Sequence, residues 1–364
     1  MQVPNVPTEP PSNPLSFVSP EDMLHTNLSS AILLATIPTL DTPHFLAPVI
    51  ANAARCTHKR LVIVLFSRVF NSTAQQTRSD SSGSVGSTCS SGVSRAGSWD
   101  EVQRLLTFVY VQATKVAQDL DRVLMEVDVL LKGFDEDLQE EVGEGMDIAF
   151  RIDGDSIPSL LPLSVSSLRT SWAMPGDPDG PEEPPSPIVD VSEPSTYHVV
   201  ALGGTFDHLH AGHKILLSMA AWIADEKIIV GVTDDALLVK KANKEVMESL
   251  DERIRRVRAF LELFKPGLVL DIVPITDVYG PTGWDPNIQA LVVSRETLSG
   301  GAAIDKHRAA SSLPPLKTFV IDVISHNSAR LDDADVEILK QTKMSSTFIR
   351  GWIAARHTLA PAPL

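Results

Sequence analysis

Short apolar runs alternate with helix-like segments through the second half of the chain. The apolar runs predict strands at YHVVALG (197–203), KIIVGV (227–232), LVLDIV (268–273), ALVVS (290–294) and KTFVID (317–322). Apolar residues at helical spacing predict helices over 212–224, 251–264 and about 304–311, and a last helix from Ser346. This alternation predicts a Rossmann-like doubly wound parallel sheet, whose ligands bind beyond the carboxyl ends of its strands.

The first half of the chain shows the same kind of pattern over a shorter distance. It predicts strands at AILLATIP (31–38), RLVIVLF (60–66) and MEVDVLL (125–131), and helices at HFLAPVIANAAR (44–55) and VQRLLTFVYVQATKVAQDL (102–120). Ser98, followed three residues later by Glu101, has the form of a capping box at the start of the second helix. These elements predict a smaller α/β domain, for which the sequence indicates no catalytic role.

Three segments with few apolar residues divide the chain. Residues 1–27 are rich in proline and predict a disordered tail, and 71–98 form a serine-rich, low-complexity insertion. Residues 171–196 combine proline, glycine and acidic residues, which is typical of a semi-rigid linker. The boundaries therefore give an N-terminal α/β domain at 28–170 and a second domain at 197–357.

Charge and composition exclude several classes of partner. The chain has 364 residues, 43% of them hydrophobic, and a formal charge of −15 without a basic cluster, which argues against binding to nucleic acid. The seven acidic residues at 135–147 lack the spacing of a calcium loop and indicate a solvated loop. No apolar run is long enough to span a membrane, and the only two cysteines, Cys56 and Cys89, predict free thiols in a reducing compartment. We therefore expect a cytoplasmic protein.

The segment GGTFDHLHAGH (203–213) joins a predicted strand to a predicted helix. Its two leading glycines let a ligand approach the backbone closely, and Gly212 leaves room beside the helix start, where free N–H groups attract anions. His210 and His213 lie three residues apart and can face the same space, which favours a phosphate site. A metal pair would need a third ligand, and a purely structural interpretation treats both histidines as polar residues at a helix start.

For two residues inside this segment, the sequence is consistent with more than one role. His208 fits a structural role as well as a functional one. Asp207 is better explained as a turn or cap residue than as an acid catalyst.

A second motif, MSSTFIR (344–350), lies where the last helix is expected to begin. The hydroxyls of Ser345 and Ser346 and the exposed amides of the first helical turn can hold phosphate oxygens. Arg350, four residues after Ser346, lies on the same helix face and can add a bidentate contact. The alternative is a plain serine cap followed by a surface arginine.

Together, these two motifs resemble the TxGTFDxxHxGH and ISSTxIR signatures of the nucleotidyltransferase superfamily. Class I aminoacyl-tRNA synthetases have related signatures, but a strongly acidic chain is a poor partner for tRNA. Residues 275–308, with YGP and VVSRETLSGG, are similar to eukaryotic-type phosphopantetheine adenylyltransferases, and the resemblance extends over about 199–353. Residues 31–66 also resemble the region that precedes this domain in eukaryotic coenzyme A synthases.

The resemblance implies a reaction and a set of residues. 4′-Phosphopantetheine would attack the α-phosphorus of ATP, giving dephospho-coenzyme A and pyrophosphate, with Mg²⁺ carried by the triphosphate and no metal site on the protein. His213 and His210 would bind the α- and β-phosphates, while Ser346, Thr347 and Arg350 would hold the outgoing pyrophosphate. The full set implied to contact ATP is Gly203, Gly204, Thr205, Phe206, His210, Gly212, His213, Ser345, Ser346, Thr347 and Arg350.

The same resemblance implies residues for the acceptor phosphate. Thr205 would orient this phosphate and Lys244 would steady it, with Lys240 and Lys241 as rivals and a solvated loop lysine as the alternative. Arg295 lies where bacterial relatives place an arginine and is a further candidate.

The sequence leaves the wider role of the chain with more than one interpretation. It contains no GxxxxGK[ST] loop, so we expect a separate dephospho-coenzyme A kinase. A cytidylyltransferase-type activity and a scaffold for other coenzyme A enzymes remain alternative functions.

Overall fold

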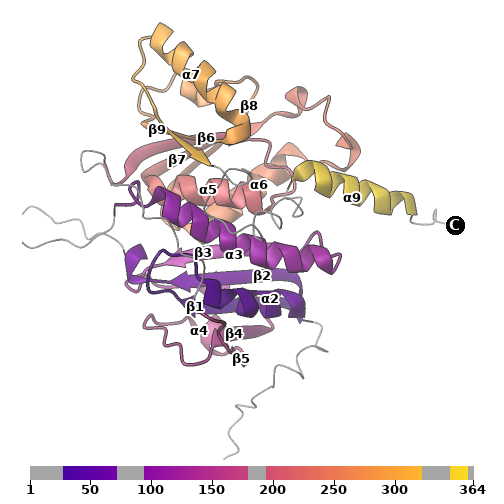
Figure 1. Cartoon of the computed structure of the whole chain (residues 1–364). Coiled ribbons are helices and arrows are strands. Elements are labelled where there is room, and N and C mark those ends of the chain that lie inside the picture. Colours follow the sequence, from indigo (N-terminus) through magenta and orange to yellow (C-terminus); the bar gives the residue numbers. More distant parts are fainter. Residues whose placement is uncertain (1–27, 72–93, 179–193, 322–344, 360–364) are drawn as a thin grey trace, which may run out of the picture.

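The computed structural model describes residues 28–71, 94–178, 194–321 and 345–359 (Figure 1). Within these ranges the chain forms two five-stranded sheets, and every strand pairing in both sheets is parallel. The predicted tail at 1–27, most of the serine-rich insertion and most of the linker lie outside the described residues. No described helix has both the length and the apolar content needed to cross a membrane.

The first sheet belongs to the N-terminal domain and has the strand order β3-β2-β1-β4-β5. Its strands are β1 (Leu28–Thr36), β2 (Thr57–Phe66), β3 (Glu126–Lys132), β4 (Ile148–Ile152) and β5 (Thr170–Ala173). Its helices are α2 (Ala47–Cys56), α3 (Trp99–Asp119) and the short α4 (Leu163–Ser166). The central strands β1 and β2 are buried along most of their length, as expected for a parallel sheet covered by helices.

The second sheet has the order β10-β9-β6-β7-β8. Its strands are β6 (Tyr197–Gly204), β7 (Ala224–Thr233), β8 (Val269–Ile275), β9 (Ala290–Ser294) and β10 (Lys317–Ile321). Its helices are α5 (Ala211–Ile223), α6 (Leu250–Phe264), α7 (Leu298–Ala310) and α9 (Ser346–Leu359). When strands are numbered from the first strand of each sheet, both sheets have the same order, 3-2-1-4-5. The predicted doubly wound α/β fold is confirmed.

The structure corrects several local predictions. Strand β5 includes residues 171–173, so the N-terminal domain extends into the segment that was expected to be linker. Helix α7 starts at Leu298, earlier than predicted, because a Ser294–Thr297 capping box leads into it. The capping box expected at Ser98 is absent, since this residue has a near-helical backbone and its hydroxyl donates to Arg95 O at 3.2 Å.

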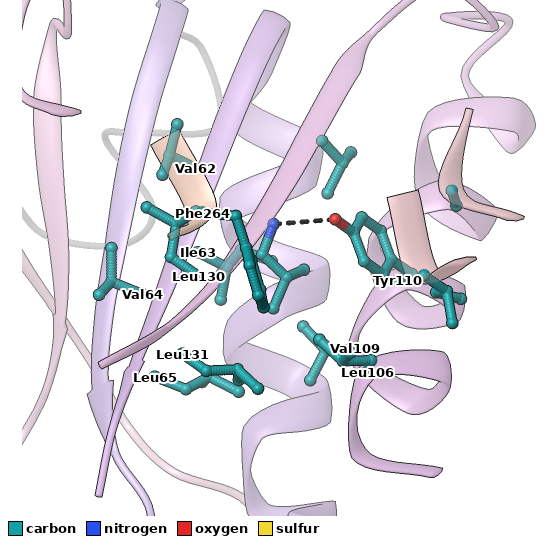
Figure 2. Packing of buried hydrophobic residues seen from close by; sticks show 14 of the residues in the cluster. Val62, Ile63, Val64, Leu65, Leu106, Val109, Tyr110, Leu130, Leu131 and Phe264 are labelled. Carbon is teal, nitrogen blue, oxygen red and sulfur yellow. Dashed lines mark hydrogen bonds between the residues drawn. The ribbon is translucent and has the colours of Figure 1, made fainter. Parts of the chain in front are cut away.

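The two domains share one buried core. Helices α5 and α6 cover the face of the second sheet that is turned toward the first domain, α3 packs against α5, and α7 lies on the opposite face (Figure 1). Phe264 at the end of α6 belongs to the same buried cluster as Ile63 and Leu130 of the first sheet (Figure 2). The interface is therefore a packed one.

At this interface, side chains provide hydrogen-bond partners for backbone groups of the edge strand β3. Val129 N–H donates to the Tyr110 hydroxyl at 3.1 Å, and Lys214 Nζ of α5 donates to Val127 O at 2.8 Å. Lys214 also forms a buried ion pair with Asp128 Oδ1 at 2.6 Å. Although burial opposes ionisation, the charges of Lys214 and Arg60 hold the pKa of Asp128 below its usual value. The helix that carries the two histidines is thus anchored to the N-terminal domain.

Candidate active site

The turn from β6 to α5 has an unusual backbone. Phe206 (φ 51°) and His208 (φ 44°) both adopt the left-handed region, which residues with a side chain seldom enter. Together they bracket Asp207, whose side chain is fully buried. Such a conformation costs free energy and persists only where surrounding contacts enforce it, which is common at functional sites.

His210 and His213 lie together at the start of α5. Their rings stack with centroids 3.9 Å apart and planes inclined by 25°. Each Nδ1 is buried without a hydrogen-bond partner among the described residues, and His210, the N-cap residue, makes no side-chain cap to the helix. Burial lowers the pKa of His213 to about 4 and that of His210 well below its usual value, so both rings are neutral near pH 7. The helix start therefore carries two neutral imidazoles whose Nδ1 atoms have no protein partner within the described residues.

The resemblance implied that Phe206 contacts ATP, and this stays a prediction. Its side chain is fully buried, so such a contact would be made by its backbone. The ring packs behind His213, with centroids 5.3 Å apart. It also explains Gly204, because a Cβ atom there would lie 3.0 Å from Phe206 Cζ, whereas the nearest atoms to a Cβ at Gly203 are 3.7 Å away. A side chain at Gly204 would therefore force the Phe206 ring to move, whether or not a ligand approaches.

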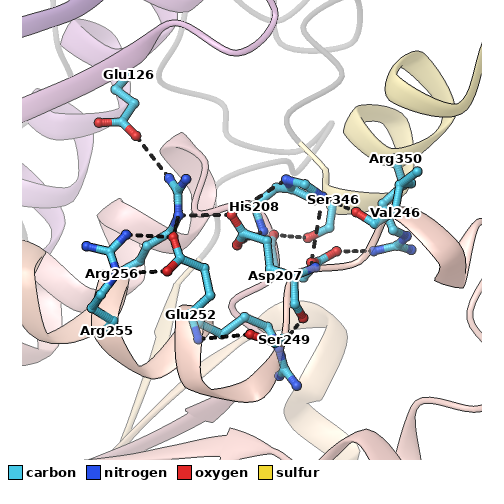
Figure 3. A network of polar contacts seen from close by, with 12 residues as sticks. Glu126, Asp207, His208, Val246, Ser249, Glu252, Arg255, Arg256, Ser346 and Arg350 are labelled. Atoms are coloured by element: carbon cyan, nitrogen blue, oxygen red, sulfur yellow. Dashed lines mark hydrogen bonds and ion pairs between the residues drawn. The ribbon is translucent and has the colours of Figure 1, made fainter. Parts of the chain in front are cut away.

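Asp207 joins the two sequence motifs. Its Oδ2 accepts from Arg350 Nη1 at 2.6 Å, and its backbone oxygen accepts from the Ser346 hydroxyl at 2.8 Å (Figure 3). Its other carboxylate oxygen accepts from Glu248 N–H at 2.9 Å. The interpretation of Asp207 as a turn residue is therefore incomplete: it is the residue through which the N-terminus of α9 is held against the β6–α5 turn.

Arg350 is buried, so it is not the surface arginine of the alternative interpretation: only 2% of its side chain is exposed and each guanidinium nitrogen has a protein partner. A direct contact of Arg350 with phosphate stays a prediction. Besides Asp207, its Nε donates to Ala242 O at 2.8 Å and its Nη2 to Thr347 Oγ1 at 3.3 Å. The Ser345 hydroxyl accepts from Phe348 N–H at 3.2 Å, as a helix cap does.

The segment that carries Lys244 is held against the same turn. His208 bonds through Nε2 to Val246 O at 2.8 Å, and its backbone N–H donates to Glu248 Oε2 at 2.8 Å (Figure 3). These contacts give His208 a structural role. The 3₁₀ turn Lys244–Val246 contacts α9, and Lys244 is exposed, as are Lys240 and Lys241.

Arg295 and Thr205 lie at the carboxyl ends of neighbouring strands. Arg295 follows β9 and is exposed, while Thr205 follows β6, the strand that pairs with β9. Arg253, which the sequence did not single out, is fully buried and donates to Thr205 O at 2.9 Å and Thr233 O at 2.8 Å. It fixes the ends of β6 and β7, and its only sequence signal is a charged residue on the apolar face of α6.

A cavity of about 280 Å³ adjoins this turn on the side of the N-terminal domain. Lys214, His210 and Leu209 line it from the second domain, and Met125 and Val127 from the first. No group of three or more histidine, cysteine or acidic side chains in the described ranges could hold a metal ion. The N-terminus of α9 thus lies against the turn that leads into the N-terminus of α5, beside this cavity.

Comparisons with known proteins place the second domain. The family model described as cytidylyltransferase-like matches residues 201–352. A phosphopantetheine adenylyltransferase of Saccharomyces cerevisiae is 47% identical over 154 residues, which are 42% of this chain and 48% of the yeast protein. An uncharacterized protein of Schizosaccharomyces pombe is 42% identical over 156 residues, 43% of this chain and 48% of that protein. The match thus spans about half the length of each yeast protein.

An archaeal relative is matched over nearly its whole length. The phosphopantetheine adenylyltransferase of Methanopyrus kandleri is 36% identical over 155 residues, which are 43% of this chain and 90% of the archaeal protein.

Proposed function

Because this chain belongs to the phosphopantetheine adenylyltransferase family, we propose that it transfers AMP from ATP to 4′-phosphopantetheine, with dephospho-coenzyme A and pyrophosphate as products. The observation that carries the proposal is the stacked pair of His210 and His213, whose buried Nδ1 atoms have no partner within the described structure. The pair lies at the start of α5, and Asp207 ties this helix start to the start of α9.

The chemistry requires positioning more than proton transfer. The acceptor phosphate is already an anion, so its attack on the α-phosphorus needs no general base and no covalent intermediate. Negative charge then develops on the leaving pyrophosphate. N–H donors of His213 and His210, with the free amides of the first turn of α5, stabilise that charge in this proposal.

The roles proposed for the other residues follow from their positions in the fold. Thr205, Lys244 and Arg295 are the proposed contacts for the acceptor phosphate, since all three are carried by segments at the carboxyl edge of the sheet. Ser345, Ser346 and Thr347 present the first amides of α9 to the pyrophosphate end. Arg350 acts in this proposal as a positioning residue, because its guanidinium is committed to Asp207.

The remaining assignments rest on the reaction itself. Mg²⁺ enters with ATP, bound to the triphosphate. A separate dephospho-coenzyme A kinase would consume the product, and contacts with other coenzyme A enzymes are part of the same proposal. We propose the cytoplasm as the compartment.

A substrate panel tests the proposal. Pyrophosphate release is measured with ATP or CTP, each combined with 4′-phosphopantetheine, pantetheine without phosphate, or phosphocholine. We expect release with ATP and 4′-phosphopantetheine alone. Release with CTP and phosphocholine would instead establish a cytidylyltransferase, and the absence of release from every pair would favour a scaffold.

A further inference from the structure

A second cavity, of about 330 Å³, lies between the two domains at the far end of α5. It is lined by apolar side chains, among them Phe70, Trp222 and Phe264, and by three cationic side chains, Arg95, Lys132 and Lys265. Glu136 and Asp137 also line this cavity. The proposed reaction does not use these three cations.

Lys132 and Arg95 lack hydrogen bonds from their charged groups within the described residues. Lys132 is 2% exposed, and its one ion pair, with Glu136 Oε2, is long at 3.9 Å. The Arg95 guanidinium lies over the Trp222 ring, 4.8 Å from its centroid. The buried ammonium of Lys132 and the half-buried guanidinium of Arg95 thus face the cavity with few protein acceptors.

Lys265 lies at the C-terminal end of α5. Its Nζ donates to Ala221 O at 2.8 Å and to Ala224 O, which leaves one of its three N–H donors unused. Burial and the charge of Arg95 lower the pKa of Lys265 to about 7, and burial also lowers the pKa of Lys132. Glu136 raises the pKa of both lysines and Asp225 that of Lys265, but burial has the larger effect, so an added anion would stabilise both ammonium groups.

We propose that this cavity binds the phosphate group of a small organic ligand among Arg95, Lys132 and Lys265, with the apolar part of the ligand against Phe70 and Trp222. Three donors that come from different segments suit a tetrahedral oxyanion better than a planar carboxylate. The site is separate from the histidine pair, because Trp222 and Lys265 lie at the opposite end of α5. Since Lys265 caps α5, the ligand stabilises the helix that carries His210 and His213.

The test measures binding of inorganic phosphate to the full chain by titration calorimetry. His213→Ala serves as the background, so that binding at the proposed active site does not mask the second site. We expect Lys132→Met in this background to weaken phosphate binding at least tenfold, while Lys59→Met, which changes an exposed lysine on β2, leaves it unchanged. Equal phosphate affinity with and without Lys132→Met, or no binding to the background protein, would overturn the proposal.

Two further measurements probe the site without relying on the Lys132→Met variant. In the folded background protein, NMR of ¹³C-methylated lysines follows Lys265, and phosphate is expected to shift its signal and raise its pKa; an unmoved signal refutes the site. Citrate replaces phosphate in a parallel titration. Binding of citrate as tight as that of phosphate would contradict the assignment of a phosphate group.

Discussion

The two sheets of this chain have the same strand order, yet only the second carries the residues of the proposed phosphate site. In the second sheet, β6 leads through Gly203 and Gly204 to an uncapped helix start with His210 and His213. In the first sheet, the corresponding turn from β1 to α2 contains no glycine between Thr36 and Ala47. Shared topology supplies a position for a ligand, and the residues of one turn decide whether the position is used.

The first sheet fills its own equivalent position with protein groups. Thr36 donates its backbone N–H to Asp155 Oδ2 at 2.8 Å, and Pro48 in the first turn of α2 has no N–H to offer. Gly176, which follows β5, donates to Phe45 O at 2.8 Å, and a Cβ there would lie 2.9 Å from Pro48 Cγ. The chain beyond β5 therefore packs over the start of α2.

The largest effect is expected for the buried ion pair between Asp207 and Arg350, which lies at the first turn of the second domain. Arg350→Met leaves the Asp207 carboxylate buried without its cation, and we expect it to lower the free energy of unfolding by about 3–5 kcal/mol. Urea denaturation measures this change. Arg255→Met is the matched control, because Arg255 pairs with Glu252 on the surface, where about 0–1 kcal/mol is expected. Equal effects of the two substitutions would contradict the anchoring role of Arg350.

The next prediction compares histidines at equivalent turns. His213→Ala should keep the fold and reduce turnover by about 100-fold or more, the scale for loss of one transition-state donor. His44→Ala, in the turn that precedes α2, should leave turnover unchanged, because this ring packs on Phe108 in the N-terminal domain. Steady-state pyrophosphate release measures both. Near-normal turnover of His213→Ala would remove this residue from the site.

A smaller effect separates the two glycines at the end of β6. Gly204→Ala places a Cβ against the buried Phe206 ring and should cost about 1–3 kcal/mol of stability. Gly203→Ala meets only ordinary contacts and should cost less than about 1 kcal/mol. Thermal unfolding of the two variants, measured side by side, checks the order, and a larger loss for Gly203→Ala would refute the explanation through Phe206.

The smallest expected effect is on pH dependence. The pKa of His213 is about 4 in the folded chain and near 6.5 when unfolded, so the unfolded chain binds more protons between these values. The contribution of this ring to stability is complete above pH 6.5 and is lost as the pH falls toward 4. His213→Asn should therefore reduce the loss of stability between about pH 6.5 and about pH 5.5 by about 1 kcal/mol. Identical profiles of the two proteins would contradict a buried, neutral His213.

The sequence predicted well what depends on neighbouring residues. Apolar runs located all five strands of the second sheet, where ALVVS coincides with β9, and β1, β2 and β3 of the first sheet, but the short strands β4 and β5 were not predicted. Glycines and histidines close together in the chain located the β6–α5 turn, because local spacing survives folding. The same reasoning placed the start of α9 at Ser346.

The sequence could not predict contacts between distant segments. Asp207 and Arg350 are 143 residues apart, and Lys214 and Asp128 are 86 apart, so neither pair has a local signature. For the same reason the sequence did not show that the Phe206 ring packs behind His213. The matching strand order of the two sheets also emerges only from the pairing of non-consecutive strands.

The central claim is that phosphate chemistry belongs to the β6–α5 turn and the start of α9. A crystal structure of the chain with Mg²⁺ and an ATP analogue that cannot be cleaved at the α-phosphorus tests it most directly. The account predicts the α-phosphate within hydrogen-bonding distance of His213, and the β- and γ-phosphates between α5 and the amides that follow Ser345. A triphosphate bound at the β1–α2 turn, or away from both histidines, would contradict it.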